Sequence, residues 1–159
     1  MTRLSTAMRV GTALAAVAVG ALAFSAPAYA AIVVKPYAAD SGDGCGTVSG
    51  NLGWHVAPLP NTTSLVDVTG TLVDHPRINE SLTLCFDGRY SVVTFTAYHE
   101  KTVVDTDAAK VDNGQQAIDT SLTSDSTAPI DLVVVQVCRV SNTGTVPDYC
   151  GTAVHYKAP

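Results

Sequence analysis

The sequence predicts an all-β fold, an antiparallel β-sandwich of about seven strands with two disulfides. Several segments alternate apolar and polar residues with a period of two, and Gly, Pro, Asn or Asp separates them about every 10 to 20 residues. No stretch after residue 30 has a helical period, and Val and Thr recur throughout. Four cysteines allow two disulfides. A small closed β-barrel is the alternative architecture.

Residues 1–30 have the organisation of a secretory signal peptide. Arg3 and Arg9 give a positive start, residues 10–24 are almost wholly apolar, and residues 28–30 place small side chains before a cleavage point. The apolar segment is shorter than the roughly 20 residues that a transmembrane helix needs. We therefore expect cleavage before Ala31 and release of one soluble extracellular domain that spans residues 31–159.

The charge of that domain narrows the choice of partners. Residues 31–159 hold 7 basic and 14 acidic side chains, a formal charge of −7, and the acids are scattered along the chain. Nucleic acid is not expected as a partner, because phosphate binding needs a basic patch. We expect no cofactor and no membrane contact in the mature form. The expected partner is an extracellular protein or a carbohydrate.

The most apolar stretch of the domain predicts a C-terminal hairpin. Residues 133–137 are almost continuously apolar, as in a central strand, and residues 152–156 can return beside them. A register that pairs Cys138 with Cys150 also sets residues of like character opposite each other: Gln136 and Thr152, Val134 and Val154, Leu132 and Tyr156. This agreement supports a Cys138–Cys150 disulfide across the hairpin.

A second disulfide then joins Cys45 to Cys85. The cysteines are separated by 39, 52 and 11 residues, and no C-x-x-C pair exists, so the spacing fits no zinc site. The bridge would tie a loop rich in Gly and Asp to the strand that precedes Asp87-Gly88. An Asp-Gly pair between alternating strands predicts a two-residue hairpin turn, in which Cys85 faces Tyr90.

The other strands are predicted at residues 31–36, 64–73, 81–86, 89–98 and 116–123, with a weak strand at 103–104. Segments rich in Gly, Pro or polar residues are predicted as loops: 40–46, 51–63, 105–116 and 124–129. Gly70 interrupts the apolar side of its strand. It predicts a bulge or a close approach of two backbones.

The order of the later strands resembles that of immunoglobulin-like sandwiches. Residues 118–122, 132–138 and 152–156 resemble strands E, F and G of that architecture. The chain departs from true immunoglobulin domains because residues 64–73, in the position of strand B, have no cysteine, and because Trp54 precedes that strand. In composition the whole chain is similar to small secreted β-sandwich proteins of actinomycetes. That likeness implies no particular function.

Residues that could carry chemistry form no established motif. The chain has no G-x-S-x-G sequence. Its four histidines lack the spacing of a metal-binding pair: His55, His75, His99 and His155. Two acid pairs are candidates for calcium, but they do not match the EF-hand pattern: Asp40 with Asp43, and Asp105 with Asp107. We predict no catalytic residue and no metal site.

Two loop features predict binding. Trp54 and Tyr149 lie in predicted loops, where an aromatic ring can anchor a partner. Residues 139–149 form a loop closed by a disulfide, which loses little entropy on docking. The predicted contact residues are Trp54, Arg139, Asp148 and Tyr149. In the alternative interpretation, Trp54 fills one end of the sandwich and the disulfide only stabilises a hairpin tip.

The sequence therefore predicts a secreted, non-catalytic binding module, with the 139–149 loop as the candidate surface for a partner. A small secreted hydrolase is the alternative. The two hypotheses differ in one structural expectation. An enzyme would bring two or more of the histidines together with a carboxylate in a cleft.

Overall fold

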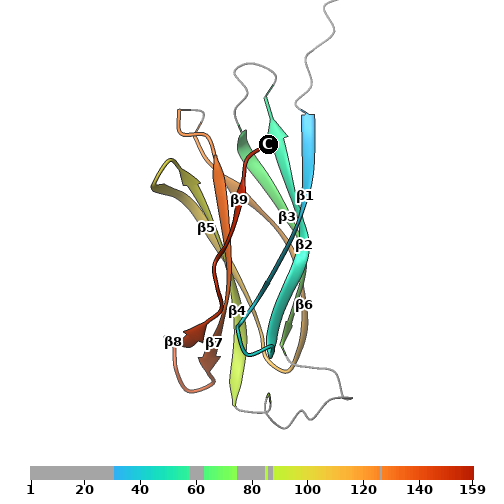
Figure 1. Ribbon diagram of the computed structural model, residues 1–159, viewed down its shortest axis with the longest axis vertical. Helices are drawn as coiled ribbons and strands as arrows, with labels where there is room; N and C mark the ends of the chain where they lie inside the picture. The colour runs from blue at the N-terminus through green and yellow to red at the C-terminus, as the bar shows by residue number, and fades with distance from the viewer. Residues whose placement is uncertain (1–30, 58–62, 75–84, 86–87, 126) are drawn as a thin grey trace, which may run out of the picture.

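The computed structural model describes residues 31–57, 63–74, 85, 88–125 and 127–159. They form nine strands in two antiparallel sheets (Figure 1). Sheet A has the order β1-β2-β3-β6. Sheet B has the order β5-β4-β7, with β8 and β9 both paired to the outer edge of β7. The bounds are β1 Ala31–Asp40, β2 Gly46–Val56, β3 Thr63–Asp74, β4 Arg89–His99, β5 Thr102–Val111, β6 Gly114–Thr123, β7 Leu132–Ser141, β8 Pro147–Cys150 and β9 Val154–Lys157.

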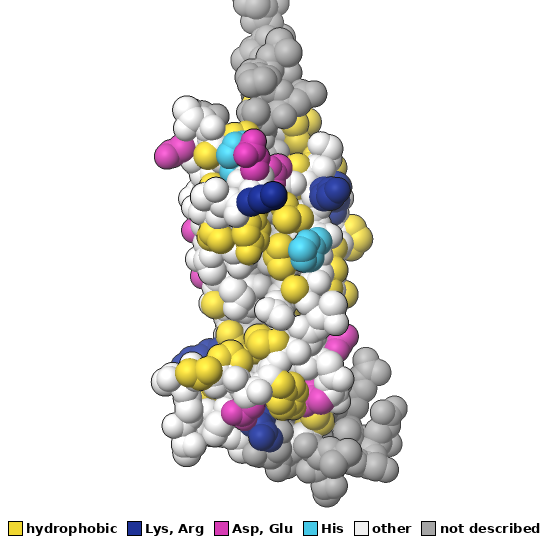
Figure 2. All heavy atoms as spheres, turned by 60° about the vertical axis from the view of Figure 1, so that its left-hand side comes forward, with side chains coloured by type: hydrophobic (Ala, Val, Ile, Leu, Met, Phe, Trp, Pro, Cys, Tyr) yellow, Lys and Arg dark blue, Asp and Glu magenta, His cyan; other side chains and the backbone are white. Residues whose placement is uncertain are grey.

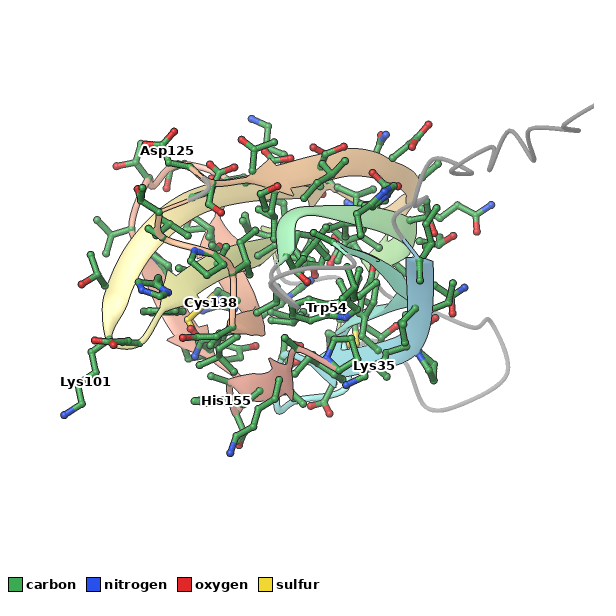
Figure 3. The ribbon with its side chains drawn as sticks, turned by 90° about the horizontal axis from the view of Figure 1, so that it is seen from above. Lys35, Trp54, Lys101, Asp125, Cys138 and His155 are labelled. Carbon is green, nitrogen blue, oxygen red and sulfur yellow. A yellow bond between two sulfur atoms is a disulfide. The ribbon has the colours of Figure 1, made fainter. Side chains whose placement is uncertain are left out.

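The core lies between the sheets and is built from alternate residues of each strand. In β7 the inner row comprises Val133, Val135 and Val137, each with 0% of its surface exposed. Trp54 of β2 and Phe95 of β4 are the largest apolar side chains of this layer. Figure 3 looks along the strands and shows Trp54 between the two sheets. The period-two alternation of the sequence is thus the pattern that fills the core.

The two sheets do not join into a closed barrel. Among the described residues, no backbone ladder links an edge strand of sheet A to one of sheet B, and the contacts there involve side chains. Between β5 and β6, the Thr120 hydroxyl donates to the Asp107 carboxylate at 2.5 Å, and the Thr123 amide donates to Asp105 at 2.7 Å. Between β1 and β9, the Tyr156 hydroxyl accepts from the Ala38 amide at 2.9 Å. The predicted sandwich is confirmed, and the closed-barrel alternative is wrong.

Two predicted loops are strands. Residues 51–56 belong to β2, in which Val48, Leu52 and Trp54 face the core. Its glycines hid the alternation, and Gly50 is needed because it lies opposite Gly70 of β3, where an added Cβ would overlap the Thr69 carbonyl. This close approach is the one that Gly70 predicted. Residues 105–111 belong to β5, whose inward acids bond to β6 instead of packing in the core.

The predicted Asp87-Gly88 hairpin does not describe the start of β4. Gly88 has the positive φ of 70° that such a turn favours. However, β4 bonds to β5 on one edge and to β7 on the other, and Tyr90 faces Val140. From Ser91 onward both edges of β4 are paired, so the predicted pairs of Leu84 with Ser91 and Leu82 with Val93 have no free edge. The predicted strand 81–86 otherwise lies outside the described residues, except for Cys85.

Both predicted disulfides, Cys45–Cys85 and Cys138–Cys150, are confirmed. Cys138 lies opposite Cys150 as expected, but beyond that point the predicted register is wrong by one residue. Tyr156 faces Val133, and Val154 faces Val135. Residues 151–153 leave the ladder and shift the pairing. The slip turns Val154 and Tyr156 towards the core-facing row of β7, which the predicted register would not have done.

The part of the chain that the structure describes contains no helix long and apolar enough to cross a membrane.

Candidate functional site

Two of the four predicted contact residues are buried, so their prediction as surface contacts is wrong. Trp54 is 0% exposed and lies within β2, not in a loop. The alternative interpretation, in which it packs inside the sandwich, is the one that holds. Arg139 is also 0% exposed, because it continues the inward-facing row of β7. Neither side chain can reach a partner in this fold.

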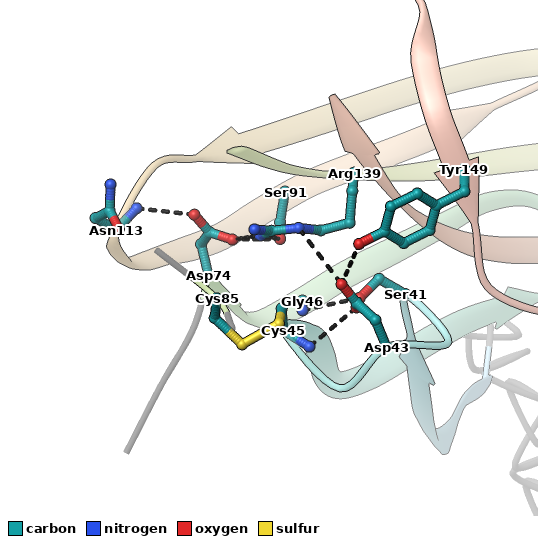
Figure 4. Close-up of a disulfide and its surroundings, with 10 residues drawn as sticks. All are labelled: Ser41, Asp43, Cys45, Gly46, Asp74, Cys85, Ser91, Asn113, Arg139 and Tyr149. Atoms are coloured by element: carbon teal, nitrogen blue, oxygen red, sulfur yellow. Dashed lines mark hydrogen bonds and ion pairs between the residues drawn. A yellow bond between two sulfur atoms is a disulfide. The ribbon is translucent and has the colours of Figure 1, made fainter. Parts of the chain in front are cut away.

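Arg139 belongs to a buried polar cluster at one end of the sandwich (Figure 4). Its guanidinium donates to the Asp74 carboxylate of β3 and, at 2.9 Å, to the Ser91 hydroxyl of β4. The Ser91 hydroxyl in turn donates to Asp74 Oδ1 at 2.6 Å, and the backbone N–H of Asn113 donates to Asp74 Oδ2 at 2.9 Å. These hydrogen bonds help to compensate the free-energy cost of removing the Arg139 and Asp74 charges from water. The cluster joins three core strands.

Asp43 connects this cluster to the N-terminal loop. Its carboxylate accepts from the hydroxyls of Ser41 and Tyr149 and from the Cys45 amide at 3.0 Å. Arg139 Nε lies 3.9 Å from the same carboxylate. Burial alone would raise the pKa of Asp43. The hydrogen bonds and the Arg139 charge outweigh burial and hold the pKa below its usual value.

Asp148 and Tyr149 lie at the surface, but both interact with the rest of the chain. Arg89 Nε donates to Asp148 at 2.6 Å and its guanidinium lies 5.8 Å from the centre of the Tyr149 ring. The loop itself is shorter than expected, because β7 runs to Ser141 and β8 begins at Pro147. The role of these two residues in contacting a partner stays a prediction.

The described histidines lie apart from one another. His55 of β2 bonds to Asp67 of β3 at 2.6 Å on the outer face of sheet A. His99, at the end of β4, bonds to the Pro129 carbonyl at 2.8 Å, and His155 lies on β9. His75 lies outside the described residues. Within those residues, no three His, Cys, Asp or Glu side chains are placed to hold a metal ion.

The outer face of sheet B is hollowed, and we take this hollow as the candidate site. It has a volume of about 700 Å³, against about 450 and 340 Å³ for two other hollows of the surface. The floor consists of β4 and β7, with the disulfide-closed hairpin at one end and the β4–β5 turn at the other. Figure 2 shows apolar side chains over this region with His and Lys beside them.

The strand register arranges the floor as three cross-strand rungs. In the first, Tyr98, Leu132 and Lys157 lie side by side on β4, β7 and β9. In the second, Thr96, Val134 and His155 do the same, and Thr94 faces Gln136 in the third. An apolar row on β7 is therefore flanked by a hydroxyl row on β4 and a nitrogen-bearing row on β9.

Most polar side-chain groups on this face make no hydrogen bond to another described residue. Among the described residues, no hydrogen bond involves the side chains of Thr94, Thr96, Tyr98 or His155. Gln136 differs from these four residues, because its side-chain amide donates to the Gly151 carbonyl at 3.0 Å. On sheet A, by contrast, Asp67 is bonded by both His55 and Ser121. The outer face of sheet B thus keeps donors and acceptors available for a ligand.

Sequence reasoning missed both the buried cluster and the hollowed face, although alternation carried a signal for each. Extending the inner rows by two residues would have placed Arg139, Ser91 and Asp74 on the core side of their strands. The outer rows follow from the same parity, but their juxtaposition needs the order of β4, β7 and β9. Comparisons with protein-family models, with curated proteins and with solved structures found no match for this chain.

Proposed function

We propose that this chain is a secreted, non-catalytic binding module that contacts its ligand through the outer face of sheet B. The observation that carries the proposal is the hollow of about 700 Å³. Its centre is apolar, and the polar side chains beside it, on β4 and β9, make no hydrogen bonds to other described residues. A surface of this kind offers both a desolvated centre and directional hydrogen bonds.

Two further features support the proposal. The disulfides are of the kind that persists in an oxidising compartment, in agreement with the signal-like residues 1–30. The strand order supports an immunoglobulin-like sandwich, because β2-β3-β6 corresponds to strands A-B-E and β5-β4-β7-β9 to C′-C-F-G. In this proposal the 139–149 loop contributes through Pro147, which lines the hollow together with the Cys138–Cys150 disulfide.

The test replaces one apolar residue at the centre of the hollow. Val134→Asp puts a charge on the half-buried floor, and Val34→Asp makes the same change on sheet A, where Val34 is 60% exposed. Both variants of the mature protein are checked for folding by circular dichroism. They are then tested by biolayer interferometry against neutral oligosaccharides, carboxylated oligosaccharides and acidic peptides.

We expect at least one ligand class to bind the wild type. Val134→Asp should weaken that binding more than tenfold, because it desolvates a charge at the centre of the contact. Val34→Asp should leave it unchanged. Equal binding by the two variants, or no binding by any member of the panel, would refute the proposal.

A further inference from the structure

The floor of the hollow, on β4 and β7, offers a ligand side chains and no free strand edge. β4 is bonded to β5 and β7, and β7 is bonded to β4 and to β8 or β9, so their ladders are occupied on both edges. An extended peptide usually docks by adding its own backbone to a free strand edge. Lying flat on this face, it would leave its amides without such partners. The face favours a ligand whose polar groups lie along its rims.

The three rows match the cross-section of a sugar chain. A pyranose ring presents an apolar C–H face, and its hydroxyls project around the perimeter. The row of Leu132 and Val134 can receive the ring faces, and the hydroxyls of Thr96 and Tyr98 lie on the neighbouring strand. Because adjacent strands are about 4.8 Å apart, the three rows together span about 10 Å. Successive rungs repeat about every 7 Å along the strands, which suits a linear chain.

Charge distinguishes the two margins of the face. The β9 margin carries Lys157 and His155, both exposed, and Lys101 lines the upper end of the hollow beside Glu100. On β4 the side chains of the three rungs, Thr94, Thr96 and Tyr98, carry hydroxyls and no carboxylate or amine. Figure 3 shows Lys101 and His155 pointing away from the core. On a domain with a formal charge of −7, the Lys157 ammonium beside the apolar row and the Lys101 ammonium at the end of the hollow favour anionic groups on a ligand.

We infer that the ligand is a linear polysaccharide that carries carboxylate groups along one edge. This inference rests on the proposed function of the same face. The apolar β7 row takes the sugar rings, the β4 row binds hydroxyls, and the β9 row binds carboxylates. Affinity for such a chain falls with rising salt, because the cations are exposed and therefore screened.

The experiment compares two ligands that differ only in charge. Oligogalacturonate and its methyl-esterified form are titrated into the mature protein by isothermal titration calorimetry at 50 and 500 mM NaCl. We expect the carboxylated chain to bind at least fivefold more tightly than the ester at low salt. We expect that difference to shrink at high salt. An acidic peptide of the same charge serves as the competing ligand class.

The variants assign the effect to the β9 margin. Lys157→Gln should weaken binding of the carboxylated chain and leave binding of the ester unchanged. Lys110→Gln, which removes the same charge from β5 on the opposite side of the β4 row from Lys157, should alter neither. A general loss of fold would weaken both ligands alike, so the ester is an internal control.

The outcomes separate this inference from the proposed function. Equal affinity for the acid and the ester would overturn the inference, and so would a Lys157→Gln variant that binds the acid as the wild type does. Preference for the acidic peptide, abolished by Val134→Asp, would overturn the inference and leave the proposed function standing. Binding of no ligand would overturn both.

Discussion

Arg139 and Asp74 form a charge pair with no exposed surface, held by Ser91 and Asn113. Removing one partner leaves the other charge buried and uncompensated. We expect Arg139→Ala to lower the free energy of unfolding by about 3–5 kcal/mol, measured by urea denaturation. The double variant Arg139→Ala with Asp74→Ala should lose less than the sum of the two single variants. Additive losses would show that the pair is not coupled.

Asp43 makes the stability of the domain depend on acid pH. Its pKa is below the ordinary value of 3.8, so the folded state favours the carboxylate. This contribution is fully present above about pH 3.8 and is lost as the pH falls through the lower folded-state pKa. We expect Asp43→Asn to be less stable than the wild type at pH 6, with the gap narrowing towards pH 2. Chemical denaturation across this range measures it, and a constant gap would contradict the assignment.

Among the strands, the contact between the C-terminal hairpin and the N-terminal loop depends on Gly151. Its amide donates to the Val137 carbonyl at 2.9 Å, and an added Cβ would overlap the Asp40 carbonyl. Gly151→Ala should therefore lower the free energy of unfolding by about 1–3 kcal/mol. Gly144→Ala is the control, because its nearest contact would be an ordinary 3.5 Å. Equal melting temperatures for the two variants would rule out the close approach.

Strand prediction succeeded where the inward row was apolar and failed where it was not. The inward row of β7 is Val at three successive positions, that of β4 contains Val93, Phe95 and Ala97, and that of β3 has apolar residues on both sides of Gly70, which made their alternation readable. In β2 the row includes Gly50, and in β5 it includes Asp105 and Asp107. Those residues have roles set by neighbours that are distant in sequence. Pattern alone could not show them.

At the scale of the whole molecule, a disulfide is expected to add more to the free energy of unfolding when it closes a longer loop. Cys45–Cys85 spans 40 residues and Cys138–Cys150 spans 12. The chain-entropy model assigns them about 4 and about 3 kcal/mol of stability, respectively. We expect the double variant Cys45→Ala with Cys85→Ala to melt at a lower temperature than Cys138→Ala with Cys150→Ala. The reverse order in calorimetry would show that native contacts, and not loop length, set these contributions.

The sandwich class and both cysteine pairs could be predicted because each depends on local alternation or on counting. The candidate site could not be predicted as a whole. Its rungs depend on β9 pairing with β7 after a one-residue slip at residues 151–153, where Gly151 lies against the Asp40 carbonyl of a segment distant in sequence. Arg139 was predicted as a surface contact because it follows Cys138 in the segment that the disulfide closes, whereas it continues the inward row of β7. Its partner Asp74 lies 65 positions earlier.

The disulfides, the Arg139 cluster and the Asp43 contacts all lie towards the same end of the sandwich, around β8 and the 41–46 loop. The opposite end, where β1 begins and β9 ends, has no covalent link among the described residues. Thermal opening of such a molecule should be directional. Amides near Ala31 and Lys157 would exchange with solvent deuterium first, while those near Cys45 and Cys138 would exchange only on global unfolding. Limited proteolysis of the folded protein should likewise cut near Ala31 or Lys157 before it cuts near either disulfide.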